Sequence, residues 1–449
     1  MRVVQRKFSA VLGGLALVCL LVCLVAAQPA RAVTLLRDPD IENALKQLGN
    51  PILQAAGLSP SRVKILVIRD ATLNAFVVDS NHIFIHSGLI LKLTTPEQLQ
   101  AVIAHEAAHI ANGHLTRRVL NARVARNVSG IGLALAAAAA ASGNTKAATA
   151  IGLGVSGSAQ RIFMHHTRAE ESSADQSAVR FMKRANVSPK GLVDLMLIFR
   201  GQELVSEARM DPYARTHPMS RDRLRRARSY ADGVQPKTGS PNSDYWFSRA
   251  KGKLSAFIRA PKWTRQRIND SASEDIKLMR QAVAFHRESK TTKAVATMKK
   301  LIAMRPNDPY YGELYGQILL ESRNTKPALS AYRNAVNKAP NNALVLGSYG
   351  HALLVAGQTA QALGVLEKSR ARDFTDARVM RDLGQAYAKQ GQPGMASLLV
   401  AERYALIGRM KDAGIHARRA VGQLPRGSSG WQRAQDVLSA AEVAAKSRR

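Results

Sequence analysis

The most regular hydrophobic pattern in the chain begins just after residue 95. Apolar side chains recur there at the three- and four-residue spacing of a helix with a buried face: Leu99, Val102, Ile103, Ala107 and Ile110. Helix-start signals precede them, because Thr95 can cap the helix, Pro96 suits its first position and Gln98 completes a capping box. The pattern therefore predicts a half-buried helix that starts at residue 96.

Upstream, the chain contains three short runs with the composition and alternation of β-strands. They cover residues 63–68, 74–78 and 82–86 and are rich in β-branched and aromatic side chains. Asp79-Ser80-Asn81 separates the last two runs and has the composition of a tight turn. We predict a small antiparallel sheet ahead of the helix. Its edge strand either holds an extended peptide or belongs to a scaffold hairpin without a ligand.

The first 32 residues have the three-part pattern of a secretory signal peptide. A basic start precedes an almost wholly apolar run at residues 8–25, and Ala30-Arg31-Ala32 fits a small-x-small cleavage site. A retained membrane anchor is the alternative, since the apolar run approaches the length of a spanning helix. We therefore predict an exported, periplasmic protein, either free or membrane-associated.

Both cysteines of the chain, Cys19 and Cys23, fall inside this N-terminal segment. The remaining chain therefore has no disulfide and no thiol chemistry. Any catalysis there must use a metal ion or carboxylates.

Small residues recur with a period of 34 residues in the C-terminal part of the chain. One position holds Ala282, Gly316, Gly350 and Gly384, and a second holds Ala294, Ala328, Ala362 and Ala396. Small residues where paired helices approach closely, at this period, are typical of tetratricopeptide repeats. We predict a helical tetratricopeptide solenoid over residues 271–440, with a shift of half a repeat after Gly391. Its groove either holds a peptide or partner protein, or the repeats pack against the rest of the chain.

The chain is strongly basic, with a formal net charge of +33. Residues 1–32 hold four basic and no acidic side chains, so 29 of these net positive charges lie beyond them. Such a field attracts polyanions, which for an exported protein are anionic membrane surfaces and acidic partner proteins. We expect no nucleic-acid partner, because helix-turn-helix, zinc-finger and aromatic RNA-binding signatures are lacking. Solvated basic faces with no specific partner are the alternative.

Within the predicted helix, His105-Glu106-Ala107-Ala108-His109 forms an H-E-x-x-H pattern. Histidines four apart lie on one helix face, so both rings can reach one metal ion. Glu106 lies beside them and can act as the general base of a zinc peptidase. We predict one Zn²⁺ ion per chain, bound by His105 and His109, with Glu106 as the catalytic residue. The alternative is a helix whose histidines only form hydrogen bonds.

A catalytic zinc ion usually has a third protein ligand, and an acidic segment offers one. Glu171 and Asp175 are four apart on a predicted helix, so one can bind the metal while the other orients a ligand histidine. Spacing alone does not choose between Glu170 and Glu171. A solvated acidic helix start is the alternative.

The H-E-x-x-H pattern followed by E-x-x-A-D at Glu171 to Asp175 resembles a known peptidase family. That family includes the CAAX prenyl proteases and bacterial heat-shock membrane proteases. The resemblance implies that Glu171 is the third zinc ligand and Asp175 its orienting partner. Thr167 and Ser173 depart from the family pattern, which usually has Ser and Glu there. Further matches lie in two short segments upstream of the motif helix: Asn74-Ala75-Phe76 as a substrate-binding strand, and Ser87-Gly88-Leu89.

A later segment resembles a subgroup of that family, the periplasmic barrel-assembly-enhancing metalloproteases. Thr216-His217-Pro218 and Arg223 fit its T-H-P-x-x-x-x-R element. The resemblance implies that His217 is a regulatory fourth ligand that holds the enzyme off, and that Arg223 is a site arginine. A surface histidine before a proline is the alternative for His217. We place the remaining nearby histidines beside the ligands or on the surface: His114, His165 and His166.

These patterns together predict an α+β, mostly helical protein. We expect a signal peptide at 1–32, a zincin-type metallopeptidase domain at 33–232, a linker and connector helix at 233–270, and the repeats at 271–440. The halves of the apolar stretch at 130–157 are too short to span a membrane. They form either a mobile helical hairpin, a lid or a membrane-touching loop, or a pair of closely packed helices in the peptidase core.

The resemblance implies an exported zinc endopeptidase with a chaperone-like role in outer-membrane β-barrel quality control. Its substrates would be unfolded or stalled outer-membrane proteins, and its repeats would contact the barrel-assembly machinery. The alternative is a repeat-based chaperone or scaffold whose zinc site is latent and self-inhibited.

Overall fold

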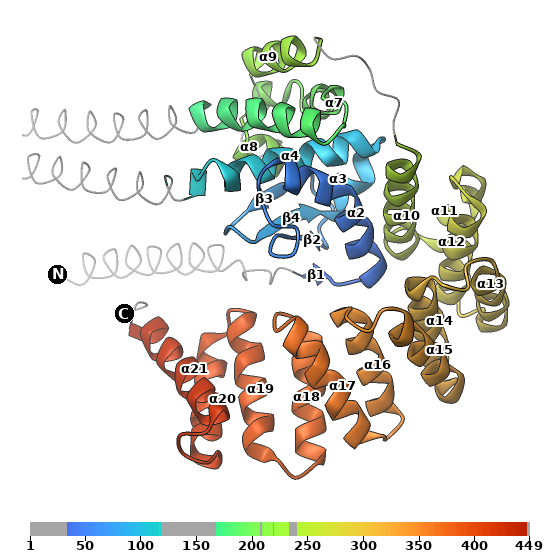
Figure 1. Ribbon diagram of the computed structural model, residues 1–449, viewed down its shortest axis with the longest axis vertical. Coiled ribbons are helices and arrows are strands. Elements are labelled where there is room, and N and C mark those ends of the chain that lie inside the picture. The colour runs from blue at the N-terminus through green and yellow to red at the C-terminus, as the bar shows by residue number, and fades with distance from the viewer. Residues whose placement is uncertain are drawn as a thin grey trace, which may run out of the picture. The chain divides into compact units, whose positions relative to one another are not determined.

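The computed structural model describes most of the chain beyond residue 33. The described residues are 34–115, 117, 168–206, 209–218, 220–232 and 240–446. The predicted signal peptide, the apolar stretch at 130–157 and both His165 and His166 lie outside them. From Leu35 onward the chain forms one compact unit (Figure 1). Among the described residues, no helix combines the length and apolar character that crossing a membrane requires.

The predicted strands form a four-stranded sheet together with a short strand near residue 35. Its strands are β1 (Leu35–Leu36), β2 (Lys64–Ile68), β3 (Ala75–Val77) and β4 (His82–His86), in the order β1-β2-β4-β3. The prediction of a purely antiparallel sheet is wrong, because β2 pairs with β4 in parallel while β4 pairs with β3 in antiparallel fashion. The turn at residues 79–81 closes the β3–β4 hairpin, and β4 then lies between β3 and β2. Because β4 lies next to β2, these two strands run parallel where the prediction had antiparallel strands.

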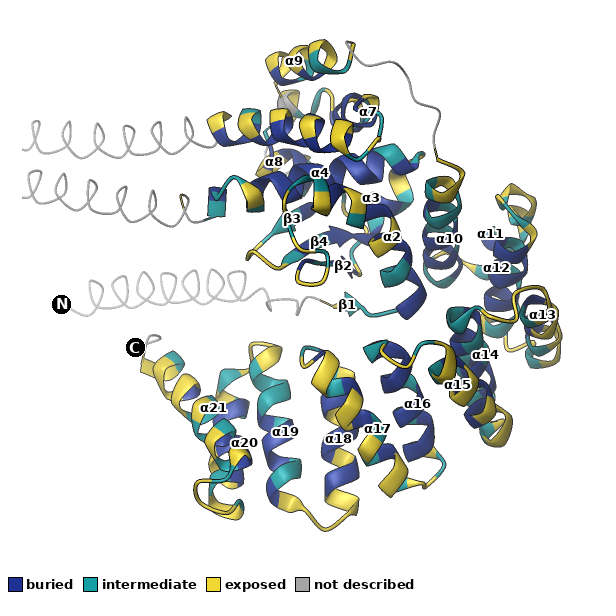
Figure 2. Cartoon of the chain, in the orientation of Figure 1, coloured by how far each residue is buried: buried dark blue, intermediate teal, exposed yellow. Residues whose placement is uncertain are grey.

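Three helices cover one face of the sheet and form the core with it. They are α2 (Pro39–Ala55), α3 (Ser87–Lys92) and α4 (Pro96–Ala111). The capping box of α4 is confirmed, since Thr95 Oγ1 accepts from Gln98 N and the Gln98 side chain accepts from Thr95 N. Residues 98–109 of α4 are buried on all sides rather than on one face, because α2, α7 and the sheet all pack against this helix. The expectation of a half-buried helix is therefore wrong (Figure 2).

The second half of this domain is helical. A helix at residues 168–184 precedes α7 (Lys190–Ile198), the short 3-10 turn η1 (Gln202–Leu204), α8 (Pro212–Thr216) and α9 (Arg221–Asp232). α7 packs against both α4 and α9. These helices close the side of the domain on which the H-E-x-x-H pattern lies.

α10 (Pro241–Ile258) connects this domain to the helical repeats and packs against both. It contacts α2 and α3 on one side and α12 on the other. Two of its cations are completely buried and bind carboxylates from both sides: Arg249 lies 2.7 Å from Asp40 and 2.6 Å from Asp308, and Lys253 lies 2.9 Å from Asp38. We call these five residues the junction cluster.

The C-terminal part is a stack of helix pairs, as the 34-residue period predicts. After α11 (Pro261–Gln266) and η3 (Ile268–Asp270) the chain forms ten helices: α12 (Glu274–Arg287), α13 (Thr291–Met304), α14 (Pro309–Glu321), α15 (Thr325–Lys338), α16 (Ala343–Val355), α17 (Thr359–Arg372), α18 (Ala377–Lys389), α19 (Pro393–Leu406), α20 (Met410–Gln423) and α21 (Ser429–Lys446). The small residues are required at the crossings: a Cβ on Gly316 would lie 2.9 Å from the Tyr332 ring, and one on Gly350 would lie 2.5 Å from Leu366. α19 packs against both α18 and α20, which explains the half-repeat shift.

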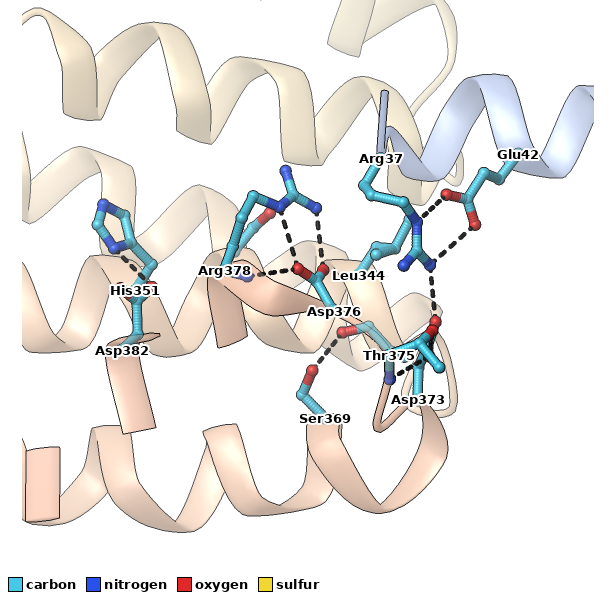
Figure 3. Close-up of polar contacts among 12 residues, drawn as sticks. Arg37, Glu42, Leu344, His351, Ser369, Asp373, Thr375, Asp376, Arg378 and Asp382 are labelled. Carbon is cyan, nitrogen blue, oxygen red and sulfur yellow. Dashed lines mark hydrogen bonds and ion pairs between the residues drawn. The ribbon is translucent and has the colours of Figure 1, made fainter. Parts of the chain in front are cut away.

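A second set of ion pairs joins the start of the peptidase domain to the repeats. Arg37, just before α2, lies 2.6 Å from both Glu42 and Asp373 (Figure 3). Asp373 belongs to the turn between α17 and α18 and also lies 3.2 Å from Lys64 of β2. Burial alone would raise the pKa of Asp373, but Arg37, a hydrogen bond from Thr375 and Lys64 together hold it well below its ordinary value.

Candidate metal centre

Four side chains from three segments converge below the surface of the peptidase domain. His105 and His109 lie on α4, Glu171 lies on the helix at 168–184, and His217 directly follows α8. Each is at most 3% exposed, and their ligand atoms all lie within 4.8 Å of one another. This set is the group of potential metal ligands found among the described residues. The neighbouring Glu170 is not part of it.

The separations between these atoms fit one tetrahedral metal ion. His105 Nε2 is 3.2 Å from His109 Nε2 and 3.3 Å from His217 Nδ1. The Glu171 carboxylate lies 3.2 Å from His105 Nε2 and 3.4 Å from His109 Nε2. It also lies 3.0 Å from His217 Nδ1. Ligand atoms bound tetrahedrally to zinc at about 2.0–2.1 Å are about 3.3 Å apart. Three nitrogens and a carboxylate at these separations are a donor set that suits zinc.

Glu106 lies inside the same pocket and is completely buried. Its Oε1 is 3.4 Å from Nε2 of His217, the ring nitrogen on the far side from the ligand cluster. His217 therefore reaches the ligands with Nδ1 and Glu106 with Nε2. Its ring occupies the space between the carboxylate and the ligand atoms.

A chain of charged contacts orients His105. Asp175 Oδ1 lies 3.1 Å from His105 Nδ1, and Arg223 binds both Asp175 oxygens at 2.7 and 2.8 Å. Burial disfavours the charged carboxylate, but Arg223 and His105 outweigh it and hold the pKa of Asp175 below its ordinary value. Arg223 also donates to the Pro218 carbonyl at 2.8 Å and lies 3.2 Å from Glu171. It ties the His217 turn to the helix that carries Glu171.

Another histidine contacts the ring of His109. His114 Nδ1 lies 3.0 Å from His109 Nδ1, and His114 is only 1% exposed. Of the two sequence-based placements for His114, the structure gives the position beside a ligand. His114 follows His109 by five residues, and residues five apart do not share a helix face. The spacing therefore gives no geometric reason to expect this contact.

Tyr213 is a pocket residue that the sequence reasoning missed. It is fully buried, and its ring centroid lies 4.6 Å from that of His217. Burial and the nearby Glu106 raise the pKa of Tyr213 well above its ordinary value, so the phenol stays neutral. Its backbone N donates to Leu73 O at 3.0 Å, which anchors α8 to the residue before the predicted substrate-binding strand. Its only sequence signal is an aromatic residue four positions before the histidine.

The predicted strand Asn74-Ala75-Phe76 lies at the edge of the sheet next to α4. Ala75 packs into the core, and Phe76 lies on the opposite face with its ring 5.5 Å from that of Phe84. Asn74 O accepts from His86 N, whereas the buried Asn74 Oδ1 has no hydrogen-bond partner among the described residues. Within the part of the chain that the structure describes, the outer edge of β3 pairs with no other strand.

Two helix-borne histidines, an adjacent buried glutamate and a carboxylate from a second helix define a metallopeptidase-type centre. Residues 39–231 match the model of "Peptidase family M48". This part of the chain is therefore similar to the domains of peptidase family M48, a class that implies a metal-dependent peptidase.

About two thirds of the chain is similar to barrel-assembly-enhancing proteases, which confirms the resemblance seen in the motifs. The "Beta-barrel assembly-enhancing protease" of Escherichia coli (strain K12) is 23% identical over 310 residues, covering 67% of this chain and 62% of that protein. The "Mitochondrial metalloendopeptidase OMA1" of Schizosaccharomyces pombe is 29% identical over 195 residues, covering 41% of this chain and 52% of that protein. This chain thus matches less than two thirds of the length of these relatives.

Among solved structures, "Crystal structure of YrrB: a TPR protein with an unusual peptide-binding site" aligns with a TM-score of 0.30. It is 16% identical and covers 39% of this chain and 92% of that one. An overlap this loose assigns no fold. The repeats are defined by their own period and helix pairs.

Proposed function

We propose that the chain is an exported, zinc-dependent endopeptidase that acts in quality control and assembly of outer-membrane β-barrel proteins. The observation that carries this proposal is the set of ligand atoms at tetrahedral separations beside the buried Glu106. Similarity to barrel-assembly-enhancing proteases suggests the substrates, which are unfolded or stalled outer-membrane proteins.

In this proposal, His105, His109 and Glu171 hold the zinc ion. A bound zinc ion supplies a Lewis acid that polarises the peptide carbonyl and lowers the pKa of a water molecule. Glu106 takes the proton from the attacking water and later delivers it to the leaving amine. Asp175 keeps His105 in the tautomer whose Nε2 is available to the metal, and Arg223 fixes Asp175.

The edge strand β3 provides the place for a substrate. An extended peptide can add to its outer edge through main-chain hydrogen bonds, as in β-strand addition. The buried Asn74 Oδ1 supports this role, because a buried acceptor without a partner costs free energy until a donor such as a substrate N–H arrives.

His217 would hold this enzyme in a resting state. Its Nδ1 completes the ligand set while its Nε2 faces Glu106, so it fills the space that a water molecule and a substrate carbonyl need. Catalysis requires the turn at His217-Pro218 to move away. Arg223, which holds the Pro218 carbonyl, would resist that movement.

The repeats would contact the barrel-assembly machinery, and the protein would act in the periplasm, free or associated with an anionic membrane surface. We assign no role in nucleic-acid binding. The resemblance to barrel-assembly-enhancing proteases supports the contact with the barrel-assembly machinery and the location in the periplasm. The basic composition supports the association with an anionic membrane surface.

Zinc content tests the ligand assignment. Glu171→Ala should lose bound zinc, whereas Glu170→Ala, which removes the neighbouring buried carboxylate, should retain it. Metal analysis of the two purified variants is the measurement. Retention by Glu171→Ala and loss by Glu170→Ala would overturn the assignment.

Peptide hydrolysis tests the catalytic assignment. His217→Ala should raise the hydrolysis rate of an unfolded outer-membrane protein, because the fourth position opens. Adding Glu106→Gln to that variant should lower the rate by about 100- to 10,000-fold at unchanged zinc content. A double variant as active as His217→Ala would exclude Glu106 as the general base.

The second candidate is a repeat-based chaperone or scaffold with a latent zinc site, which the inserted His217 favours. Glu106→Gln in the full chain separates the two. Full rescue of a deletion strain by this variant, with zinc retained, would favour the chaperone. Loss of rescue would favour the peptidase.

A further inference from the structure

α9 has the densest run of cations in any helix of the described residues. Five of its twelve residues are arginines. Arg223 points inward to the metal centre, and the other four are exposed: Arg221, Arg225, Arg226 and Arg228. Figure 2 shows the helix with one buried and one exposed side. Three of the exposed arginines, at positions 221, 225 and 228, follow the spacing of a single helix face.

The neighbouring helix at 168–184 also carries exposed cations. The two helices are antiparallel neighbours, because Arg223 binds Asp175 and Arg226 donates to Ser172 at 3.0 Å. The exposed cations of the second helix are Arg168, Arg180, Lys183 and Arg184. We call the four exposed arginines of α9 the α9 basic face.

Few negative charges offset the α9 basic face. Asp222 and Asp232 are the exposed carboxylates of the two helices, against eight exposed cations. Asp222 pairs with Arg225, but both side chains are more than half exposed, and such pairs contribute little. The carboxylates Glu171 and Asp175 point inward and pair there with Arg223.

The sequence that adjoins this face is strongly apolar. The chain leaves the described structure at Arg117 and returns at Arg168, one helical turn from the Ser172 that Arg226 contacts. Between these points, residues 130–157 carry a single charged side chain, Lys146. A basic surface on a chain that also carries a long apolar sequence suits a lipid bilayer, whose anionic headgroups bind the cations.

We propose that the α9 basic face docks on an anionic lipid surface. Guanidinium groups bind phosphate oxygens in pairs, so a row of arginines suits lipid headgroups better than a row of lysines would. The proposal does not depend on the proposed peptidase activity. In this arrangement, Arg223 connects the inner side of the docking helix to the metal centre. The metal centre then lies roughly one helix diameter of 10 Å from the headgroups.

Vesicle binding by the full chain tests the proposal. The wild-type protein should sediment with vesicles that contain phosphatidylglycerol but not with vesicles of pure phosphatidylcholine, and added salt should weaken the binding. The triple variant Arg221→Gln, Arg225→Gln, Arg228→Gln should bind roughly 100-fold more weakly, at about 1 kcal/mol for each arginine and about 1.4 kcal/mol for each tenfold change.

A charge-matched control separates this face from net charge. Lys293→Gln, Lys299→Gln, Lys300→Gln removes the same charge from exposed positions of α13 in the repeats. It should retain the wild-type affinity, and both triple variants should keep the zinc content and circular dichroism of the wild type. Equal losses in the two variants would overturn the proposal, as would a wild-type protein that ignores anionic vesicles. Tighter binding to duplex DNA than to vesicles, lost in the α9 variant, would replace the lipid with nucleic acid.

Discussion

Two buried ionic clusters, the metal centre and the junction cluster, differ in how their charges are arranged. In the junction cluster, each cation meets a carboxylate: Arg249 lies between Asp40 and Asp308, and Lys253 contacts Asp38. In the metal centre, the ring nitrogens and the Glu171 carboxylate converge on one point. Both clusters place ionisable groups in the interior, so buried charge alone does not reveal function. The direction of the lone pairs does reveal function, because acceptors that converge on one point require a cation that the chain itself does not supply.

The largest effect is expected from breaking the junction cluster. Arg249→Met should lower the free energy of unfolding by about 3–5 kcal/mol, because Asp40 and Asp308 then lose their buried partner. Denaturant unfolding measures the loss, and the exposed Arg333→Met is the control. Zinc content per folded molecule should not change. A variant that loses zinc but keeps its stability would reverse the roles of the two clusters.

Metal removal should act on the other cluster alone. A chelator should destabilise the wild-type protein by about 2.7 kcal/mol when free zinc was initially a hundredfold above its dissociation constant. Thermal unfolding with and without chelator measures this. Arg249→Met should show the wild-type difference and Glu171→Ala almost none. A difference that survives in Glu171→Ala would place the stabilising metal elsewhere.

The contact between His114 and His109 should affect zinc affinity more weakly than a ligand does. His114→Ala should weaken zinc binding by about 10- to 100-fold, or about 1.4–2.7 kcal/mol, because His109 then loses the group that orients its ring. Competition with a zinc indicator measures the change. His114→Gln, which keeps an acceptor, should recover part of the affinity. The surface variant His82→Ala should have no effect, and an equal loss there would refute the orienting role.

A pH-dependent effect concerns Glu313, which faces Lys253 at the edge of the junction cluster. Burial, only partly offset by Lys253, raises the pKa of Glu313 from 4.5 to about 7. A raised carboxyl pKa stabilises the fold below the ordinary value, and this contribution is lost as the pH rises through about 7. Glu313→Gln should therefore gain stability relative to the wild type between pH 5 and pH 7, by at most about 1.4 kcal/mol for each pH unit. Unfolding curves at several pH values should show this trend for Glu313→Gln but not for the exposed Glu274→Gln.

The sequence predicted the parts of the molecule that local spacing controls. The capping box of α4, the histidine pair and the repeat crossings at Gly316 and Gly350 all follow from distances along one or two helices. The resemblance pointed to Glu171 rather than Glu170, and the structure places Glu171 among the ligand atoms. Spacing alone left that choice open, because tertiary packing decides which of the two residues faces the histidines.

The features that the sequence did not predict depend on contacts between distant segments. The parallel pairing of β2 with β4 depends on where a hairpin inserts, and no local pattern encodes that. The contacts of Arg249 with Asp40 and Asp308 likewise form only where three helices meet. In the sequence, these residues have no feature that distinguishes them from other helix and cap residues. Tyr213 reaches the pocket only because its backbone docks on Leu73.

The ion pair between Arg37 and Asp373 has a consequence for the order of folding. Its partners are 336 residues apart, so it closes one of the longest loops that the chain can form. During synthesis, the start of the peptidase domain must wait for the third pair of repeat helices before Arg37 finds its second carboxylate. Until then, Glu42 alone accompanies this arginine. A late step in assembling the protein is therefore expected to join its earliest described residues to the repeats.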